Sequence, residues 1–118
     1  MADDEFTRAL DSRREVDLTV TGRTSGRGIT LPVWFARDGG TLYLVPIHGS
    51  DTNWYKNVLR TPGIRLAAGS AETTASAAPV TDPAQVAEIV AKFRAKYGAE
   101  DVAAYYPKQN AAVTVPLG

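Results

Sequence analysis

The sequence predicts a mainly β protein of the α+β class, in which short antiparallel strands form a small barrel and helices cover its ends. Six short runs with strand character, joined mostly by hairpin turns, carry this prediction. The helical segments stand between groups of strands instead of alternating with single strands, which argues against a doubly wound parallel sheet. The chain has 118 residues, of which 44% are hydrophobic and 22% charged. This size and composition predict one domain, residues 1–118.

Alternation of apolar and polar residues defines the strands. Val16, Leu18 and Val20 point to one face of the first run, and its threonines point to the other. Pro32 cannot donate a ladder hydrogen bond, so its strand is expected at a sheet edge or a bulge. An Asp-Gly-Gly turn at 38–40 predicts a hairpin. Six strands are expected, over residues 15–22, 29–37, 41–47, 64–69, 72–80 and 111–117.

Three helices are expected: an N-terminal one over residues 3–14, a middle one and a C-terminal one. Ser50, Asp51 or Thr52 caps the middle helix, which ends before Pro62. The C-terminal helix, over residues 82–98, has the clearest signals. Asp82 is its N-cap, Pro83 fits the first helical position, Gln85 completes a capping box and Gly98 ends it. Its apolar stripe consists of Val86, Ile89, Val90, Phe93 and Tyr97.

Composition excludes several classes of protein. The chain has no cysteine, which excludes disulfides and thiolate metal sites, and its single histidine argues against a tetrahedral metal centre. The acidic N-terminus lacks the apolar core of a signal peptide, and no apolar run approaches the roughly 20 residues that span a bilayer. We therefore expect a cytoplasmic protein without a membrane segment. The modest basic excess over residues 13–71 falls short of a nucleic-acid-binding surface.

The loop between the first two strands, with the sequence GRTSGR over residues 22–27, is the candidate binding feature. Its glycines allow a ligand to approach the backbone, and Arg23 and Arg27 can each donate charge-assisted hydrogen bonds to a phosphate or carboxylate. The spacing matches neither a P-loop nor a dinucleotide fingerprint. From these residues alone, an anion site and a solvated hairpin are equally compatible with the sequence.

Two further features are candidates for chemistry. His48 stands beside Ser50 and Asp51, but residues so close together on one turn rarely form a catalytic triad. A contact to an anion at a helix start is the better functional role for His48, and a plain surface histidine is the alternative. Tyr105 and Tyr106 precede Pro107, and at least one of the two rings is expected to be partly exposed. Such a pair can stack on a flat ligand, donate a proton, or form a simple surface patch.

Read together, TGRTSGR, LPVWFARDGGTLYLV, GS and NWYKNVLRTPGIRL, in this order, resemble the deazaflavin-dependent nitroreductase family, also called the F420H2-dependent quinone reductase family. The resemblance extends from about Thr19 to Leu66. It implies a split β-barrel related to the FMN-binding pyridoxamine-phosphate-oxidase-like proteins. It also implies that coenzyme F420, an 8-hydroxy-5-deazaflavin, binds with its charged arm on the arginine-containing loop and its ring alongside residues 30–33. The implied cofactor residues are Arg23, Thr24, Ser25, Arg27, Thr30, Leu31, Pro32, Val33, His48, Gly49, Ser50, Trp54, Tyr55 and Asn57.

The activity implied by the resemblance is hydride transfer from reduced deazaflavin to a quinone, a nitroaromatic or another small electron-poor acceptor. The cofactor supplies the difficult chemistry, so no catalytic triad is expected, and Tyr105 or Tyr106 is the candidate proton donor. Split barrels commonly pair, so a homodimer with the strand of Pro32 at its interface is compatible with the sequence. Two alternatives stay open: an FMN-binding flavoprotein on the same fold, and a non-catalytic protein that binds a cofactor, haem or lipid.

Overall fold

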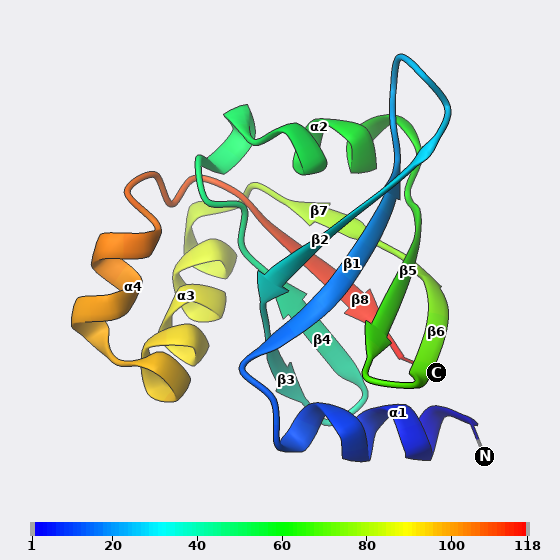
Figure 1. Cartoon of the computed structure of the whole chain (residues 1–118). Helices are drawn as coiled ribbons and strands as arrows, with labels where there is room; N and C mark the ends of the chain where they lie inside the picture. Colours follow the sequence, from blue (N-terminus) through cyan, green and yellow to red (C-terminus); the bar gives the residue numbers. More distant parts are fainter. Residues whose placement is uncertain (1, 118) are drawn as a thin grey trace.

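The computed structural model describes residues 2–117 and shows two four-stranded antiparallel sheets with helices around them (Figure 1). The first sheet has the strand order β2-β1-β5-β6, and the second has the order β3-β4-β8-β7. The first sheet contains β1 (Glu15–Thr21), β2 (Gly28–Trp34), β5 (Gly63–Ala68) and β6 (Ala71–Ser76). The second contains β3 (Ala36–Asp38), β4 (Thr41–Leu44), β7 (Ala78–Val80) and β8 (Ala112–Pro116).

The single six-stranded barrel expected from the sequence is not confirmed, because two of the expected strands change sheet. The run 29–37 bends at Phe35 into β2 and β3, and the run 72–80 bends at Ala77 into β6 and β7. Each run therefore supplies a strand to both sheets, so six runs give eight strands. Pro32 lies on β2, which is an edge strand as expected.

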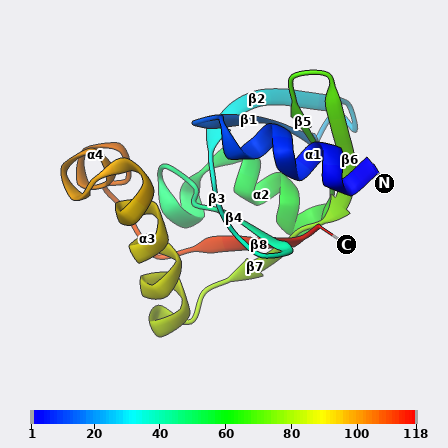
Figure 2. The same cartoon turned by 90° about the horizontal axis from the view of Figure 1, so that it is seen from below.

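The helices lie around the sheets as expected, with one addition. α1 (Ala2–Asp11) lies at one end of the sheets and α2 (Asn53–Arg60) at the opposite end, while α3 (Pro83–Tyr97) and α4 (Ala99–Tyr105) lie together at one side (Figure 1; Figure 2). A 3₁₀ turn, η1 (Gly49–Asp51), precedes α2, whose N-cap is Thr52. Asp82 caps α3 as expected, since its carboxylate accepts from Gln85 N (3.1 Å).

The sequence did not predict α4. Its seven residues bury a single side chain, that of Val102, and a helix with one buried position shows no apolar stripe. Gly98, with a φ of +98°, ends α3 and lets the chain start α4 at the next residue.

Buried side chains form two clusters. The larger cluster lies between the sheets and contains Leu18, Leu42, Leu66 and Val113, each with 0% exposed surface. The smaller one holds α3 and α4 against the second sheet and includes every residue of the predicted α3 stripe. No helix within residues 2–117 is long and apolar enough to cross a membrane.

The hydroxyl of Tyr97 secures the bend at Phe35. It accepts from Phe35 N (3.1 Å), and its own proton faces the carbonyl oxygens of Arg14 (2.6 Å) and Phe35 (2.9 Å). A residue at a bend leaves its strand ladder, so its buried backbone groups need other partners. Tyr97, on α3, supplies these partners. It thereby ties the helix to the residue at which the chain leaves the first sheet and enters the second.

We predict that Tyr97→Phe lowers the free energy of unfolding by about 1–3 kcal/mol, because the buried N–H of Phe35 loses its acceptor. Burial raises the pKa of Tyr97 to about 12, so the folded state holds this proton more tightly than the unfolded state does. The contribution of Tyr97 to stability is therefore complete below pH 10 and decreases between pH 10 and 12. Urea unfolding of wild type, Tyr97→Phe and the control Tyr43→Phe across this range measures both effects. Equal stabilities and parallel pH profiles would contradict the assignment.

Candidate anion-binding site

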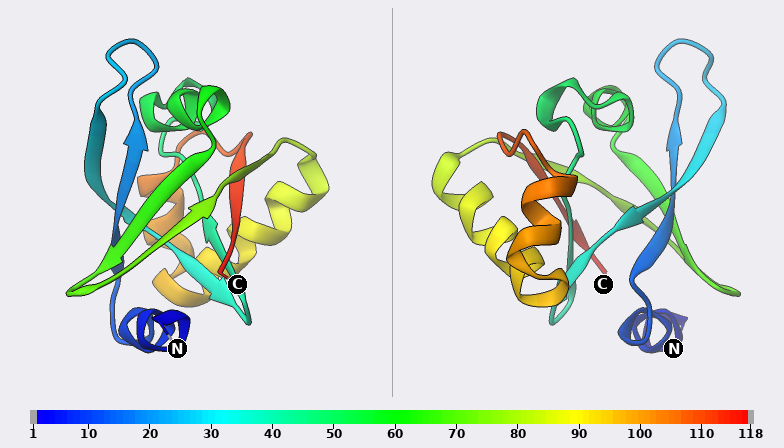
Figure 3. Two further views of the ribbon diagram at one scale, coloured as in Figure 1. Left: turned by 90° about the vertical axis from the view of Figure 1, so that its right-hand side faces the viewer. Right: turned by 60° about the vertical axis from the view of Figure 1, so that its left-hand side comes forward.

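The β1–β2 loop, residues 22–27, is closed by its own hydrogen bonds. Gly22 N donates to Arg27 O (2.8 Å), Gly26 N donates to Gly22 O (2.8 Å), and Arg27 N donates to Ser25 Oγ (3.2 Å). Gly22 is buried, and a Cβ there would lie 2.7 Å from Ser25 Oγ. A side chain at this position would therefore displace the Ser25 hydroxyl that accepts from Arg27 N. The loop rises beside α2 (Figure 3).

Asn57, on α2, holds the loop against the helix. Its side-chain oxygen accepts from Arg23 N (3.0 Å) and from Arg23 Nη1 (2.8 Å). Arg23 Nη1 also donates to the carbonyl oxygen of Asn53, in the first turn of α2 (3.3 Å). Asn57 is only 4% exposed, so this amide is a buried polar anchor rather than a surface contact. The contact fixes both the backbone and the guanidinium of Arg23.

The acceptors of Arg23 are neutral, so its positive charge is not compensated locally. None of the three ion pairs found within residues 2–117 includes Arg23 or Arg27. A hollow of about 310 Å³ lies where the loop meets α2. A guanidinium that is fixed in place and has no charged partner suits a phosphate or carboxylate. The hollow is lined by Gly22, Arg23, Thr24, Ser25, Ile29, Asn53 and Asn57.

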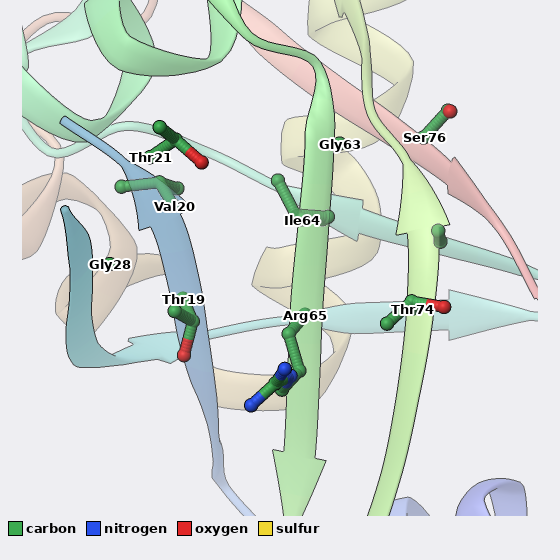
Figure 4. A pocket seen from close by; sticks show the side chains of 10 residues that line it. Thr19, Val20, Thr21, Gly28, Gly63, Ile64, Arg65, Thr74 and Ser76 are labelled. Atoms are coloured by element: carbon green, nitrogen blue, oxygen red, sulfur yellow. The ribbon is translucent and has the colours of Figure 1, made fainter. Parts of the chain in front are cut away.

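A second hollow, of about 650 Å³, lies where β1 and β5 diverge. These two strands pair over only three positions, Asp17–Thr19 with Ala67–Arg65, whereas β1 and β2 pair along their whole length. The lining of this hollow includes Thr19 and Thr21 on β1 and Thr74 and Ser76 on β6, with β5 between these two strands, and Arg65 is its one charged side chain (Figure 4). Thr21 and Gly28 of its lining directly adjoin Gly22 and Ile29 of the first hollow. The two hollows are therefore neighbours along the β1–β2 hairpin.

The structure places His48, Gly49 and Ser50 in contact with a different segment. Ser50 N donates to Asn110 Oδ1 (2.9 Å), and Asn110 Nδ2 donates to Ser50 Oγ (3.0 Å). Asp51 forms an ion pair with Lys108 (2.6 Å), which lowers the pKa of its carboxyl group. His48 is exposed, and its backbone N–H donates to Thr52 Oγ1 (2.8 Å). Within residues 2–117, the side-chain hydrogen bonds and the ion pair of this turn that reach another segment go to the chain before β8, and none goes to the arginine-containing loop.

Two aromatic residues of the predicted cofactor set lie in the core. Trp54 is 4% exposed and Tyr55 is 2% exposed, so neither ring offers a surface on which a ligand could stack. Of the predicted residues on β2, Thr30 and Pro32 are exposed, whereas Leu31 is half-buried and Val33 is buried. Of the four predicted residues on β2, only the two on its outward face, Thr30 and Pro32, are thus fully accessible.

The predicted proton donors lie at the other end of β2. Tyr105 is half-buried, with its ring centroid 4.3 Å from that of Trp34, while Tyr106 is 2% exposed and packs edge-on against Phe93 (5.7 Å). Burial raises the pKa of both hydroxyls. Trp34 ends β2, six residues from Gly28 beside the loop, a separation of about 20 Å at 3.3 Å per residue. One ring of the pair is partly exposed, as expected.

Asn53 and Arg65 were not singled out from the sequence. Asn53 acts through its backbone carbonyl, which has no sequence signal, although its position four residues before Asn57 places both on one helix face. Arg65 is an outward residue of a short strand, and only its alternation with Ile64 and Leu66 indicated its direction. No cluster of three or more metal-ligating side chains occurs in the part of the chain that the structure describes.

A family model described as "Uncharacterized protein conserved in bacteria (DUF2255)" matches residues 7–117, and the chain belongs to this family. No curated protein matches its sequence.

Several solved structures share the fold. The F420-H2 dependent reductase FDR-A has a TM-score of 0.68 and 19% identity, over 87% of this chain and 94% of its own. HutZ, the heme storage protein from Vibrio cholerae, has a TM-score of 0.72 and 13% identity, over 96% and 87%. A putative pyridoxamine 5'-phosphate oxidase from Listeria innocua has a TM-score of 0.66 and 17% identity, over 98% and 92%. A structure described as a domain-swapped dimer has a TM-score of 0.69 and 18% identity, over 95% and 94%. At these identities the likeness shows the fold alone, which agrees with the fold family that the resemblance implied.

We predict that Asn57→Ala lowers the free energy of unfolding by about 1–3 kcal/mol and increases loop mobility, because Arg23 N loses its acceptor. Asn53→Ala is the matched control, since its backbone carbonyl survives the substitution. Chemical denaturation and amide hydrogen exchange at residues 22–27 measure the two effects. Equal protection of the loop in the two variants would contradict the anchoring role of Asn57.

A second pair of variants tests the η1 turn. Gly49 has a φ of +57°, and a Cβ there would collide with Asn110 Oδ1, whereas Gly39 has a φ of +60° and open space around it. We expect Gly39→Ala to cost about 1–2 kcal/mol through backbone strain alone. Gly49→Ala should cost about 1–3 kcal/mol more through overpacking. Thermal unfolding compares the stabilities of the two variants. Equal losses of stability would show that the Asn110 side chain moves away from the new Cβ at no cost.

Proposed function

We propose that this member of the DUF2255 family binds coenzyme F420 and acts as an F420-dependent oxidoreductase on a quinone, a nitroaromatic or a similar electron-poor acceptor. The observation that carries the proposal is the contact between Arg23 and Asn57, which holds an uncompensated guanidinium at the first hollow. The cofactor's phosphate and glutamate tail is the kind of anionic group that such a site binds. The motif resemblance, together with the F420-H2 dependent reductase among the structures that share the fold, supports this choice of ligand.

Different residues of the chain would bind different parts of the cofactor. Arg23 and Arg27 would hold the anionic tail, together with the backbone and hydroxyl groups of Thr24 and Ser25. When bound, the reduced deazaflavin supplies the hydride. Thr21, which lines the second hollow next to the loop, would offer a further hydrogen-bonding hydroxyl, whereas that of Thr19 is already bonded to Thr30 (2.7 Å).

The outward face of β2 connects the loop with the candidate proton donor. Gly28, Thr30, Pro32 and Trp34 alternate onto one face of the strand, and Tyr105 packs on Trp34. A flat ring lying beside Thr30 and Pro32 would therefore lie between the arginines and Tyr105. The hydroxyl of Tyr105 is protonated at neutral pH, although burial raises its pKa and makes it a weaker acid than an ordinary tyrosine. Tyr105 is the better candidate of the pair, since the more deeply buried Tyr106 is less accessible.

We also propose that the protein forms a homodimer through the edge of the first sheet. β2 is an edge strand, and Pro32 on it is exposed. The dimeric structure among those that share the fold supports this proposal. Sedimentation equilibrium would show a species of about twice 12.6 kDa, whereas a monomer at high concentration would contradict it.

The test of the proposed function is a binding titration with F420, FMN and haem in parallel. We expect F420 to bind most tightly and to bind more weakly as salt is added, because the contacts are ionic. Arg23→Ala should weaken F420 binding by about 10- to 100-fold, the cost of one charge-assisted hydrogen bond. The control Arg94→Ala removes a cation from α3 and should change nothing. Tighter binding of FMN would support a flavoprotein, tighter binding of haem a carrier, and no binding would refute the anion site.

A further inference from the structure

α2 and the β1–β2 loop together form a basic end of the molecule, which lies opposite α1 (Figure 1). The two segments are in contact, because Arg23 Nη1 donates to the carbonyl oxygen of Asn53 (3.3 Å). The sequence has no acidic residue over residues 18–37 or 52–71, whereas α1, with the sequence ADDEFTRALD, contains four acidic residues and one basic residue. The net charge of zero therefore conceals a separation of charge, with the basic end at α2 and an acidic end at α1.

The outward side of α2 carries two cations and a leucine. The opposite side of the helix packs into the core through Trp54, Tyr55 and Val58. Helical spacing leaves Lys56, Leu59 and Arg60 on the side that faces away from the core. Lys56 is half-buried and Arg60 is exposed.

The charges of Lys56 and Arg60 are not compensated by an ion pair. Neither residue belongs to the three ion pairs found within residues 2–117. Asp51, just before α2, is the acid nearest to them in the sequence, and it is already bound to Lys108 (2.6 Å). Arg23 and Arg27, on the loop, are likewise without an ion pair, so the basic end has four such cations.

Two large apolar side chains are exposed in the part of the chain that the structure describes, and both lie at the basic end. Leu59 is 53% exposed, and Ile29, at the start of β2, is 45% exposed. Ile29 lines the first hollow together with Asn53 of α2. At about 100° per residue, Lys56 and Arg60 lie between Leu59 and Asn53 around the helix. The cations are therefore flanked by an exposed apolar side chain on either side.

We propose that this basic end docks on an anionic lipid surface. Leu59 and Ile29 enter the boundary between headgroups and acyl chains, while the cations of α2 and the loop bind the lipid phosphates. Basic residues next to exposed apolar ones are the pattern by which a helix lies in a membrane interface. Arg23 and Arg27 are shared with the candidate anion-binding site, but Lys56, Leu59 and Arg60 lie outside it. The proposal therefore stands or fails independently of F420 binding.

A lipid surface fits the basic end better than the other anionic partners do. A second copy of the chain would offer its acidic α1, but Phe6 and Leu10 of that helix are each only 1% exposed. Such a partner would pair with the cations and leave Leu59 and Ile29 in water. A nucleic acid would likewise contact the cations mainly through its phosphates. An anionic bilayer offers both a negative surface and an apolar layer beneath it.

The test is flotation of the full chain with vesicles of phosphatidylcholine alone and with vesicles of phosphatidylcholine and phosphatidylglycerol in equal parts. We expect binding to the anionic vesicles only, and weaker binding as salt is added. Arg60→Gln should weaken binding about fivefold, which corresponds to one cation near such a surface. The matched control is Arg8→Gln, which makes the same change in net charge at an exposed position of α1 and should leave binding unchanged. Leu59→Ser should weaken binding about tenfold, because apolar burial is lost.

A second readout reports whether the apolar side chain enters the lipid. The emission of Leu59→Trp should shift to shorter wavelength on anionic vesicles. The wild type should show no shift, since Trp54 is buried and Trp34 lies at the far end of β2. Circular dichroism confirms that each variant is folded.

Four results would overturn the proposal. The first is no binding to the anionic vesicles, and the second is equal weakening by Arg60→Gln and Arg8→Gln. The third is binding without a shift in the emission of Leu59→Trp, which would show adsorption by charge alone. The fourth is salt-sensitive self-association without vesicle binding, which would show that a second copy of the chain occupies the basic end.

Discussion

The bend at Phe35 is the constraint on which the rest of the structure depends. At this residue the chain leaves the first sheet and enters the second, so its backbone groups cannot join either ladder. The Tyr97 hydroxyl accepts from its N–H, and Lys96 Nζ donates to its carbonyl oxygen. Both residues come from the end of α3, so one helix turn fixes how the two sheets meet. The ring of Trp34, next to the bend, stacks on Tyr97 with centroids 4.1 Å apart, which extends the fixed region to the end of β2.

The bend at Phe35 fixes one end of the β1–β2 hairpin, and the candidate binding loop lies at the other end. The hairpin has seven paired positions, so a rigid ladder transmits the position of the bend to the loop. In the loop, the buried side-chain amide of Asn57 accepts a hydrogen bond from the backbone N–H of Arg23, just as the Tyr97 hydroxyl accepts one from the backbone N–H of Phe35. In both places a helix side chain is the partner of a backbone group that lies outside a strand ladder. The difference lies in charge. The bend is covered by aromatic rings, whereas the loop presents a guanidinium whose partners are neutral.

Local patterns explain which parts of this fold could be predicted from the sequence. The strand runs and the capped α3 follow from alternation and capping, which are properties of neighbouring residues. The bends at Phe35 and Ala77 could not be predicted, because apolar alternation continues through Phe35 and the partner of its N–H is 62 residues away. The arginine-containing loop was visible as a cluster of charge and glycine. Its contact with Asn57 was not, because it joins residues 34 positions apart, and only the family resemblance named Asn57. α4 was missed because Val102 is its one buried side chain.

Binding of a cofactor's charged tail by the loop is the property on which the proposed function depends. The most direct measurement compares the affinity of the wild-type chain for F420 with its affinity for the deazaflavin nucleoside that lacks the phosphate and glutamate tail. If Arg23 and the loop bind the tail, F420 binds at least about tenfold more tightly at low salt, and the difference shrinks as salt screens the ionic contacts. Equal affinities for the two compounds, unchanged by salt, would show that the loop does not bind the tail.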